Sequence, residues 1–166
     1  MKTHSVVRIL TILIVLFYTS AYAQAGDMLN PKGKELSLTT DGGESFKIKI
    51  QALKPPKNFA YDQGWGWGAE ETKPKIIIKH VKAWWGKKEI SIPLSAYMDL
   101  ANPNDASLIK SGSEIHLIIK GGDASTSYKA VLIFERGLIR SRKVQHGEFP
   151  DDAWEETKYS FNELDI

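Results

Sequence analysis

The residues best suited to chemistry stand in one short stretch, "YDQGWGWGAEET", at positions 61–72. Tyr61, Trp65 and Trp67 offer flat aromatic faces, and Glu70 offers a carboxylate close to them. Aromatic rings stack against the apolar C–H face of a sugar, and a carboxylate can accept hydrogen bonds from its hydroxyls. The glycines in between would let a ligand approach the backbone closely. Any ligand surface is therefore expected on these residues, as a glycan-binding platform.

The same tryptophans also fit a structural role. Trp65 and Trp67 are two positions apart, so in extended backbone both rings point the same way, either toward a ligand or into a core. Each could bury on the order of 200 Å² and pin a long connection that would otherwise cost ordering entropy. Trp84 and Trp85 are adjacent, so a strand would direct them to opposite faces. At least one of this second pair is expected in the core, and Trp84 is included among the candidate ligand residues.

Signals for catalysis are weak in this sequence. The chain has no cysteine, so thiol nucleophiles and thiolate metal sites are excluded. His80, His116 and His146 share no short metal-type spacing, and there is no GxSxG elbow. We predict neither a metal nor a cofactor. The alternative is a hydrolase acting on carbohydrate with a pair of carboxylates, for which the candidate acids are Asp123, Glu148, Asp151 and Glu155.

One oxygen-rich stretch could bind calcium. "DLANPNDAS" supplies Asp99, Asn102, Asn104 and Asp105, and hard oxygen ligands suit that ion. The ligand order, glycine and closing glutamate of an EF-hand loop are missing. Because Asn and Asp are also ordinary turn residues, the sequence favours a plain turn here.

Basic and acidic segments follow each other near the end of the chain. In "RGLIRSRK", Arg140 and Arg142 are two apart and would share one face of a regular strand. The acidic segment that follows contains Glu155 and Glu156. We expect cross-strand ion pairs that set register between these segments, with an anionic-ligand site as the alternative.

The elements that must position these residues are short strands. Phe46, Ile48 and Ile50 alternate with polar residues, and 41–43, "DGG", supplies a tight hairpin turn before them. One short helix is expected over 95–101, capped by Ser95. Hairpin-length connections favour an all-β fold, an antiparallel sandwich or barrel of about eight to nine strands. The expected strands cover 35–40, 45–52, 75–85, 88–94, 113–120, 128–135, 138–144 and 155–161.

The first 23 residues have the order of a secretory signal peptide. Lys2 and Arg8 precede the apolar run 9–17, and Ala21-Tyr22-Ala23 forms a small-residue cleavage site. We predict cleavage after Ala23 and a periplasmic or secreted product. Residues 24–34 would be a flexible spacer and 35–166 a single domain, with no further apolar run long enough to span a membrane.

Charge argues against nucleic acid as a partner. The chain has 22 Lys and Arg against 20 Asp and Glu, a formal charge of +2. Removing Lys2 and Arg8 with the signal peptide leaves the two signs balanced, whereas nucleic-acid binding needs a concentrated positive surface. The sequence therefore predicts an exported, non-enzymatic binding module that engages a glycan or an envelope protein through its Trp/Gly-rich loop.

Overall fold

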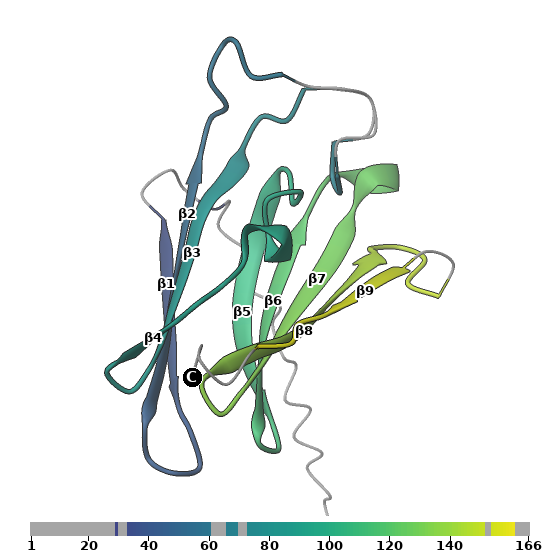
Figure 1. Cartoon of the computed structure of the whole chain (residues 1–166). Helices are drawn as coiled ribbons and strands as arrows, with labels where there is room; N and C mark the ends of the chain where they lie inside the picture. The colour runs from purple at the N-terminus through teal and green to yellow at the C-terminus, as the bar shows by residue number, and fades with distance from the viewer. Residues whose placement is uncertain (1–28, 30–32, 61–65, 70–72, 152–153, 162–166) are drawn as a thin grey trace, which may run out of the picture.

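The computed structural model describes residues 29, 33–60, 66–69, 73–151 and 154–161. In this part of the chain nine strands form two antiparallel sheets, one with the order β1-β2-β3-β4 and one with the order β5-β6-β7-β8-β9 (Figure 1). The sheets stack as a sandwich and are not closed into a barrel. The all-β antiparallel prediction is confirmed. The strands are β1 (Lys34–Thr39), β2 (Ser45–Leu53), β3 (Ile77–Trp85), β4 (Lys88–Ile90), β5 (Pro103–Ser111), β6 (Glu114–Gly121), β7 (Tyr128–Glu135), β8 (Leu138–His146) and β9 (Trp154–Lys158), and the 3-10 turns are η1 (Leu94–Ala96) and η2 (Ala124–Thr126).

The first hairpin forms as its sequence predicts. Alternate side chains of β2 are buried and the lysines between them are exposed. The Thr40 N–H donates to the Glu44 carbonyl at 2.8 Å, and the Gly43 N–H donates to the Thr40 carbonyl at 3.0 Å. Gly43 has φ +78°, a conformation that only glycine adopts without strain. Alternation and turn chemistry together therefore fix the register of β1 on β2.

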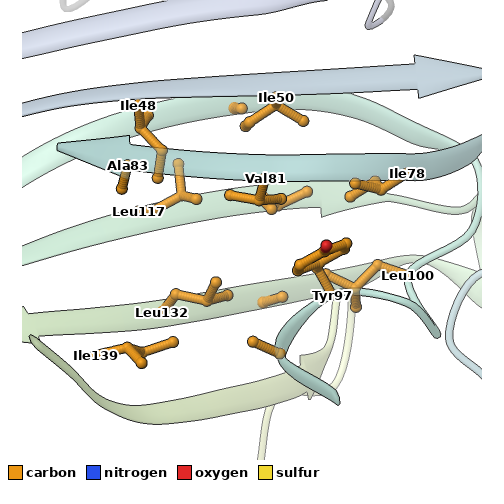
Figure 2. Close-up of a cluster of buried hydrophobic side chains, with 14 of the residues drawn as sticks. Ile48, Ile50, Ile78, Val81, Ala83, Tyr97, Leu100, Leu117, Leu132 and Ile139 are labelled. Atoms are coloured by element: carbon orange, nitrogen blue, oxygen red, sulfur yellow. The ribbon is translucent and has the colours of Figure 1, made fainter. Parts of the chain in front are cut away.

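The core lies between the two sheets. Figure 2 shows side chains from both sheets meeting in one layer, including Ile48, Ile50, Val81 and Ala83 from one sheet and Leu117, Leu132 and Ile139 from the other. Complete burial of one such aliphatic side chain contributes about 1.5–3 kcal/mol of transfer free energy. This apolar layer holds a chain without cysteine together.

Residues 91–102, which we call the crossing segment, connect the two sheets. Tyr97 and Leu100 from this segment are buried and pack at the side of the core (Figure 2). Of the short helix expected within 95–101, a single 3-10 turn forms, Leu94–Ala96. Its predicted cap is wrong: Pro93 precedes the turn and Ser95 lies inside it, without a side-chain cap hydrogen bond.

Strand β5 was not expected from the sequence, because its first residues have the composition of a turn. The strand begins at Pro103, a position that tolerates proline since the first residue of a strand need not donate to the ladder. A register shift between Pro103 and Asp105 then leaves Asn104 without a partner on β6. Strand β5 therefore lacks the regular apolar alternation that revealed the other strands.

The two sheets are joined along one edge. The Lys34 ammonium of β1 lies 3.2 Å from the Asp105 carboxylate of β5. Strand β4 forms the other edge of its sheet, and it is shorter than the predicted strand 88–94, in keeping with the proline at position 93. None of the helical turns in the described ranges has the length and apolarity needed to cross a bilayer.

Candidate functional site

Of the predicted aromatic platform, only Trp67 is among the described residues; Tyr61, Trp65 and Glu70 lie outside them. The backbone N–H of Trp67 donates to the Asp99 carbonyl at 2.8 Å, and the Trp67 carbonyl accepts from the backbone N–H of Ala101 at 2.8 Å. Its half-buried ring packs against the core, and the indole N–H donates to Glu155 Oε2 at 3.3 Å. Trp67 therefore makes the contacts that a structural plug requires, while its role toward a ligand stays a prediction.

Glycines allow the Trp67 stretch to approach the crossing segment this closely. Gly66 and Gly68 have φ of +65° and +86°. A Cβ at Gly66 would lie 2.2 Å from the Asp99 carbonyl oxygen, and one at Gly68 would lie 2.6 Å from the Ala101 carbonyl oxygen. Both positions therefore require glycine for conformation and for space.

Beneath Trp67 lies a buried ionic group. Arg142 of β8 is only 2 % exposed, and it is the only buried charged residue in the described part of the chain. It donates to the Ser95 carbonyl at 2.5 Å and to Asp99 Oδ2 at 2.6 Å, and it lies 3.5 Å from Glu155 Oε1. We call Ser95, Asp99, Arg142 and Glu155 the Arg142 cluster. It ties the crossing segment and β9 to the five-stranded sheet, since a buried charge is tolerated only with such partners.

A β-bulge explains why Arg142 is buried. Ile133 pairs with Ser141 while Phe134 pairs with Ile139, so Arg140 is the extra residue on β8. The prediction that Arg140 and Arg142 share a face is therefore wrong, because a bulge shifts the alternation by one position. Arg140 is exposed and lies 3.6 Å from Glu135. The expected pairing with Glu155 does form, but through the buried Arg142.

Tyr128 adds a buried hydroxyl next to this cluster. The residue is 2 % exposed, and its hydroxyl has no hydrogen-bond partner among the described residues. Burial raises the pKa of Tyr128 far above its usual value; the negative charge of Asp99 raises it further, and Arg142 lowers it. Asp99 Oδ1 and Arg142 Nε, like the Tyr128 hydroxyl, have no hydrogen-bond partner among the described residues. The ion pairs of Arg142 nevertheless join the crossing segment and β9 to β8, which suits an anchor better than a ligand site.

Trp84 and Trp85 lie at the other end of the sandwich. The turns that join β1 to β2, β3 to β4, β5 to β6 and β7 to β8 all lie there, at the lower end of Figure 1, and we call it the hairpin end. Trp84 lies opposite Lys47 and Glu89 in the register, on the outer face of its sheet. Trp67 bridges to Leu100, and the next residue, Ala101, bridges to Ile77 at the opposite end of β3 from Trp84. Seven residues at about 3.3 Å each separate Ile77 from Trp84, so the structure does not bring Trp67 and Trp84 together.

Trp85 faces the other way and packs against the core. Its ring meets Phe46 edge to face, with centroids 5.8 Å apart and planes at 77°. The indole N–H donates to Glu44 Oε2 at 2.6 Å, which fixes the ring orientation. The ring is still only half-buried, because a cleft opens beside it.

This Trp85 cleft has a volume of about 220 Å³ and is formed by both sheets. Lys110 of β5 reaches across to form an ion pair with Asp41 of the β1–β2 turn. The Glu114 carboxylate is 2.8 Å from the His116 ring nitrogen, and Arg136 makes no ion pair within the described ranges. The polar and aromatic groups that line the cleft include Asp41, Glu44, Trp85, Lys110, Glu114 and Arg136. The arrangement combines an aromatic ring with hydrogen-bond donors and acceptors on several sides.

The acids predicted for a hydrolase are only partly brought together. Asp123 and Glu148 line one surface hollow of about 640 Å³, next to η2. Glu155 belongs to the Arg142 cluster, and Asp151 is exposed after β8. The oxygens considered as calcium ligands are divided between other partners. Asp99 and Asp105 form ion pairs with Arg142 and Lys34, and the Asn102 side-chain oxygen accepts from the N–H groups of Lys75 and Ile76 at 2.7 and 3.1 Å.

Fold and site together define an antiparallel β-sandwich with a tryptophan-lined cleft between the hairpin turns of its two sheets. Comparison with known proteins gives no match to a family model, a curated protein or a solved structure. The geometry and chemistry of the chain itself therefore carry the functional argument.

Sequence reasoning missed most of the cleft. The Trp84-Trp85 pair was a usable signal, because one ring had to face each side of the strand. Lys110 and Asp41 are 69 positions apart, and no local pattern indicates that they meet. Their pairing depends on how the two sheets stack, which a single sequence does not reveal.

Proposed function

We propose that the protein is an exported binding module that holds one sugar ring of a glycan in the Trp85 cleft. The observation that carries the proposal is the half-exposed Trp85 ring, oriented by the 2.6 Å hydrogen bond to Glu44, in a cleft between both sheets. Ligand sites commonly combine an apolar surface with a few fixed polar groups. A volume of about 220 Å³ suits a single ring rather than a larger ligand.

The lining chemistry supports a sugar over a purely apolar group. The face of Trp85 can pack on the C–H side of a pyranose, and its polar edge is already bonded. The Asp41 carboxylate can accept hydrogen bonds from sugar hydroxyls, while Lys110 and Arg136 can donate to them. In this proposal the apolar face of the sugar ring packs on Trp85, and its hydroxyl groups form hydrogen bonds with the charged side chains of the cleft.

Export is the second part of the proposal, and it is supported by the charged, apolar and small-residue order of positions 1–23. Expression of the full chain should yield a shortened product outside the cytoplasm that begins at Gln24. Amino-terminal sequencing tests this, and a retained Met1 on a cytoplasmic product contradicts it.

The indole N–H signals of the tryptophans provide a direct test of the cleft. We would titrate ¹⁵N-labelled protein with methyl glycosides of neutral hexoses and N-acetylhexosamines and assign Trp85 with Trp85→Phe. The expected result is a concentration-dependent shift of the Trp85 signal, an unmoved Trp67 signal, and weaker binding by Glu44→Gln. Full affinity in Trp85→Phe would contradict the site, and a set of shifts confined to Trp67 would favour the loop platform instead.

A second candidate function is hydrolysis of a carbohydrate. The observation that favours it is the shared hollow of Asp123 and Glu148, since glycosidases use two carboxylates on either side of the scissile bond. Cleavage of an oligosaccharide that is lost in both Asp123→Asn and Glu148→Gln, but kept in Glu44→Gln, would support this function and displace the binding proposal. Unchanged oligosaccharide after prolonged incubation would remove it.

A further inference from the structure

The outer face of the four-stranded sheet carries a group of cations around one tryptophan. We call it the lysine face, and all of its members point away from the core or are only half-buried. The acids Glu35 and Glu89 also lie on this outer face, and the half-buried Leu53 and Ile77 stand at one end of it, so the face is mainly charged and does not resemble an apolar protein-docking patch. The lysine face consists of Lys47, Lys49, Lys79, His80, Lys82 and Trp84.

Two of these lysines are placed at a cost in stability. Lys49 lies directly opposite Lys82 in the β2–β3 register, and like charges directly opposite each other destabilise a sheet. Glu35 of β1 lies directly opposite Lys49 on its other side, but the Glu35 carboxylate forms its ion pair with Lys47, at 3.0 Å. No described carboxylate forms an ion pair with Lys49, and Lys82 reaches only Glu89, at 3.7 Å and with both side chains more than half exposed. A bound anion between the two ammonium groups would remove the repulsion.

Trp84 extends this charged row into a mixed surface. It is half-buried and lies directly opposite Lys47, and this pair is the next one on the same face after Lys49 and Lys82. Same-face positions of a strand are about 7 Å apart, so the ring and the lysine pair can contact neighbouring units of one chain-like ligand. At the far end a register shift leaves Lys79 exposed beside His80 and lengthens the row.

The choice of cation also indicates the ligand. Residues 34–93 contain eleven lysines and no arginine. Lysine is a flexible point charge, whereas arginine is the residue of planar, two-pronged recognition. A row of lysines therefore suits anionic groups at repeated but adjustable spacing, and an aromatic ring beside it suits a sugar.

We propose that the lysine face binds a linear acidic polysaccharide, with one sugar ring on Trp84 and carboxylates of neighbouring units on Lys49 and Lys82. This surface is separate from the Trp85 cleft, because Trp84 and Trp85 point to opposite sides of the same strand. The inference therefore does not rest on the cleft or on its ligand.

The chain offers a matched control for the test. Lys120 and Lys129 are also directly opposite each other and exposed, but on the outer face of the five-stranded sheet. We would titrate a galacturonic acid hexasaccharide into the wild type, K49E/K82E and K120E/K129E at low salt by calorimetry. Both double variants change the net charge equally. K49E/K82E should bind about tenfold more weakly or worse, and the control should lose much less, since charge effects fall off with distance.

Tryptophan variants and other ligands decide the remaining alternatives. Trp84→Ala should weaken binding of the galacturonic acid hexasaccharide about two- to tenfold, the range expected for one aromatic contact. Any binding of a galactose hexasaccharide without carboxylates should be unchanged in K49E/K82E and in Trp84→Ala. Two results would show that binding is only general charge attraction and would overturn the proposal. One is an equal loss of affinity in the two double variants, and the other is equal affinity for double-stranded DNA together with no effect of Trp84→Ala. If K49E/K82E fails to fold, K49Q/K82Q should still lose more affinity than the matched change at Lys120 and Lys129, although each loss should be smaller.

Discussion

The two ends of the sandwich use the same hydrogen bond for different purposes. At one end the Trp67 indole donates to Glu155 at 3.3 Å, and at the hairpin end the Trp85 indole donates to Glu44 at 2.6 Å. Glu155 also lies 3.5 Å from the buried Arg142, so Trp67 belongs to a network of structural contacts. Trp85 instead lines an open cleft. An aromatic residue therefore indicates a ligand site only when its surroundings leave a face and polar partners accessible.

The ionic pairs of the two ends should differ most in their effect on stability. Arg142 is 2 % exposed and bridges two carboxylates, whereas Lys110 and Asp41 have side chains 38 % and 73 % exposed. Arg142→Met leaves Asp99 without its buried partner and should lower the free energy of unfolding by about 3–5 kcal/mol. Lys110→Met should change it by about 0–1 kcal/mol. Urea unfolding of both variants measures the difference, and equal values would mean that the Arg142 cluster is not an anchor.

Glycines at the two ends provide the next contrast. A Cβ at Gly68 would lie 2.6 Å from the Ala101 carbonyl oxygen and 2.7 Å from Tyr128 Cε1, at φ +86°. Gly112 at the cleft has φ +59°, but a Cβ there would have no neighbouring atom within 4 Å. Gly68→Ala should cost about 2–4 kcal/mol, from strain and overpacking together, and Gly112→Ala about 1–2 kcal/mol, from strain alone. Thermal and urea midpoints should fall in that order; an equal cost would show that the Trp67 stretch is not held tightly.

The predictable parts of the fold are those with local causes. The alternation of Phe46, Ile48 and Ile50 and the turn at 41–43 determine the first hairpin, and both are visible in the sequence. Strand β5 was missed because Pro103 and Asn104 have turn composition, and its pairing to β6 depends on a neighbour already in place. Tertiary context decides such segments.

The candidate site was less predictable than the fold. Burial of Arg142 depends on a one-residue bulge at Arg140, which leaves no mark in the alternation pattern. The cleft depends on Lys110 of one sheet reaching Asp41 of the other. Both features arise from the pairing and stacking of whole strands, so residue types alone could suggest aromatic ligand contacts but not where the opening lies.

The smallest expected effect concerns the Tyr128 hydroxyl, and it tests whether the Trp67 end is closed. The pKa of Tyr128 is raised in the folded state, so the folded protein holds the hydroxyl neutral. The resulting contribution to the free energy of unfolding is fully present below about pH 10, and it is lost as the pH rises further. Tyr128→Phe should leave stability at pH 8 unchanged or raise it by up to about 1 kcal/mol, since an unpartnered buried hydroxyl is removed. Between pH 8 and pH 11 the wild type should lose about 1.4 kcal/mol relative to the variant. Urea midpoints across this range measure both effects, and parallel curves would mean that water reaches Tyr128, so that this end is as open as the cleft.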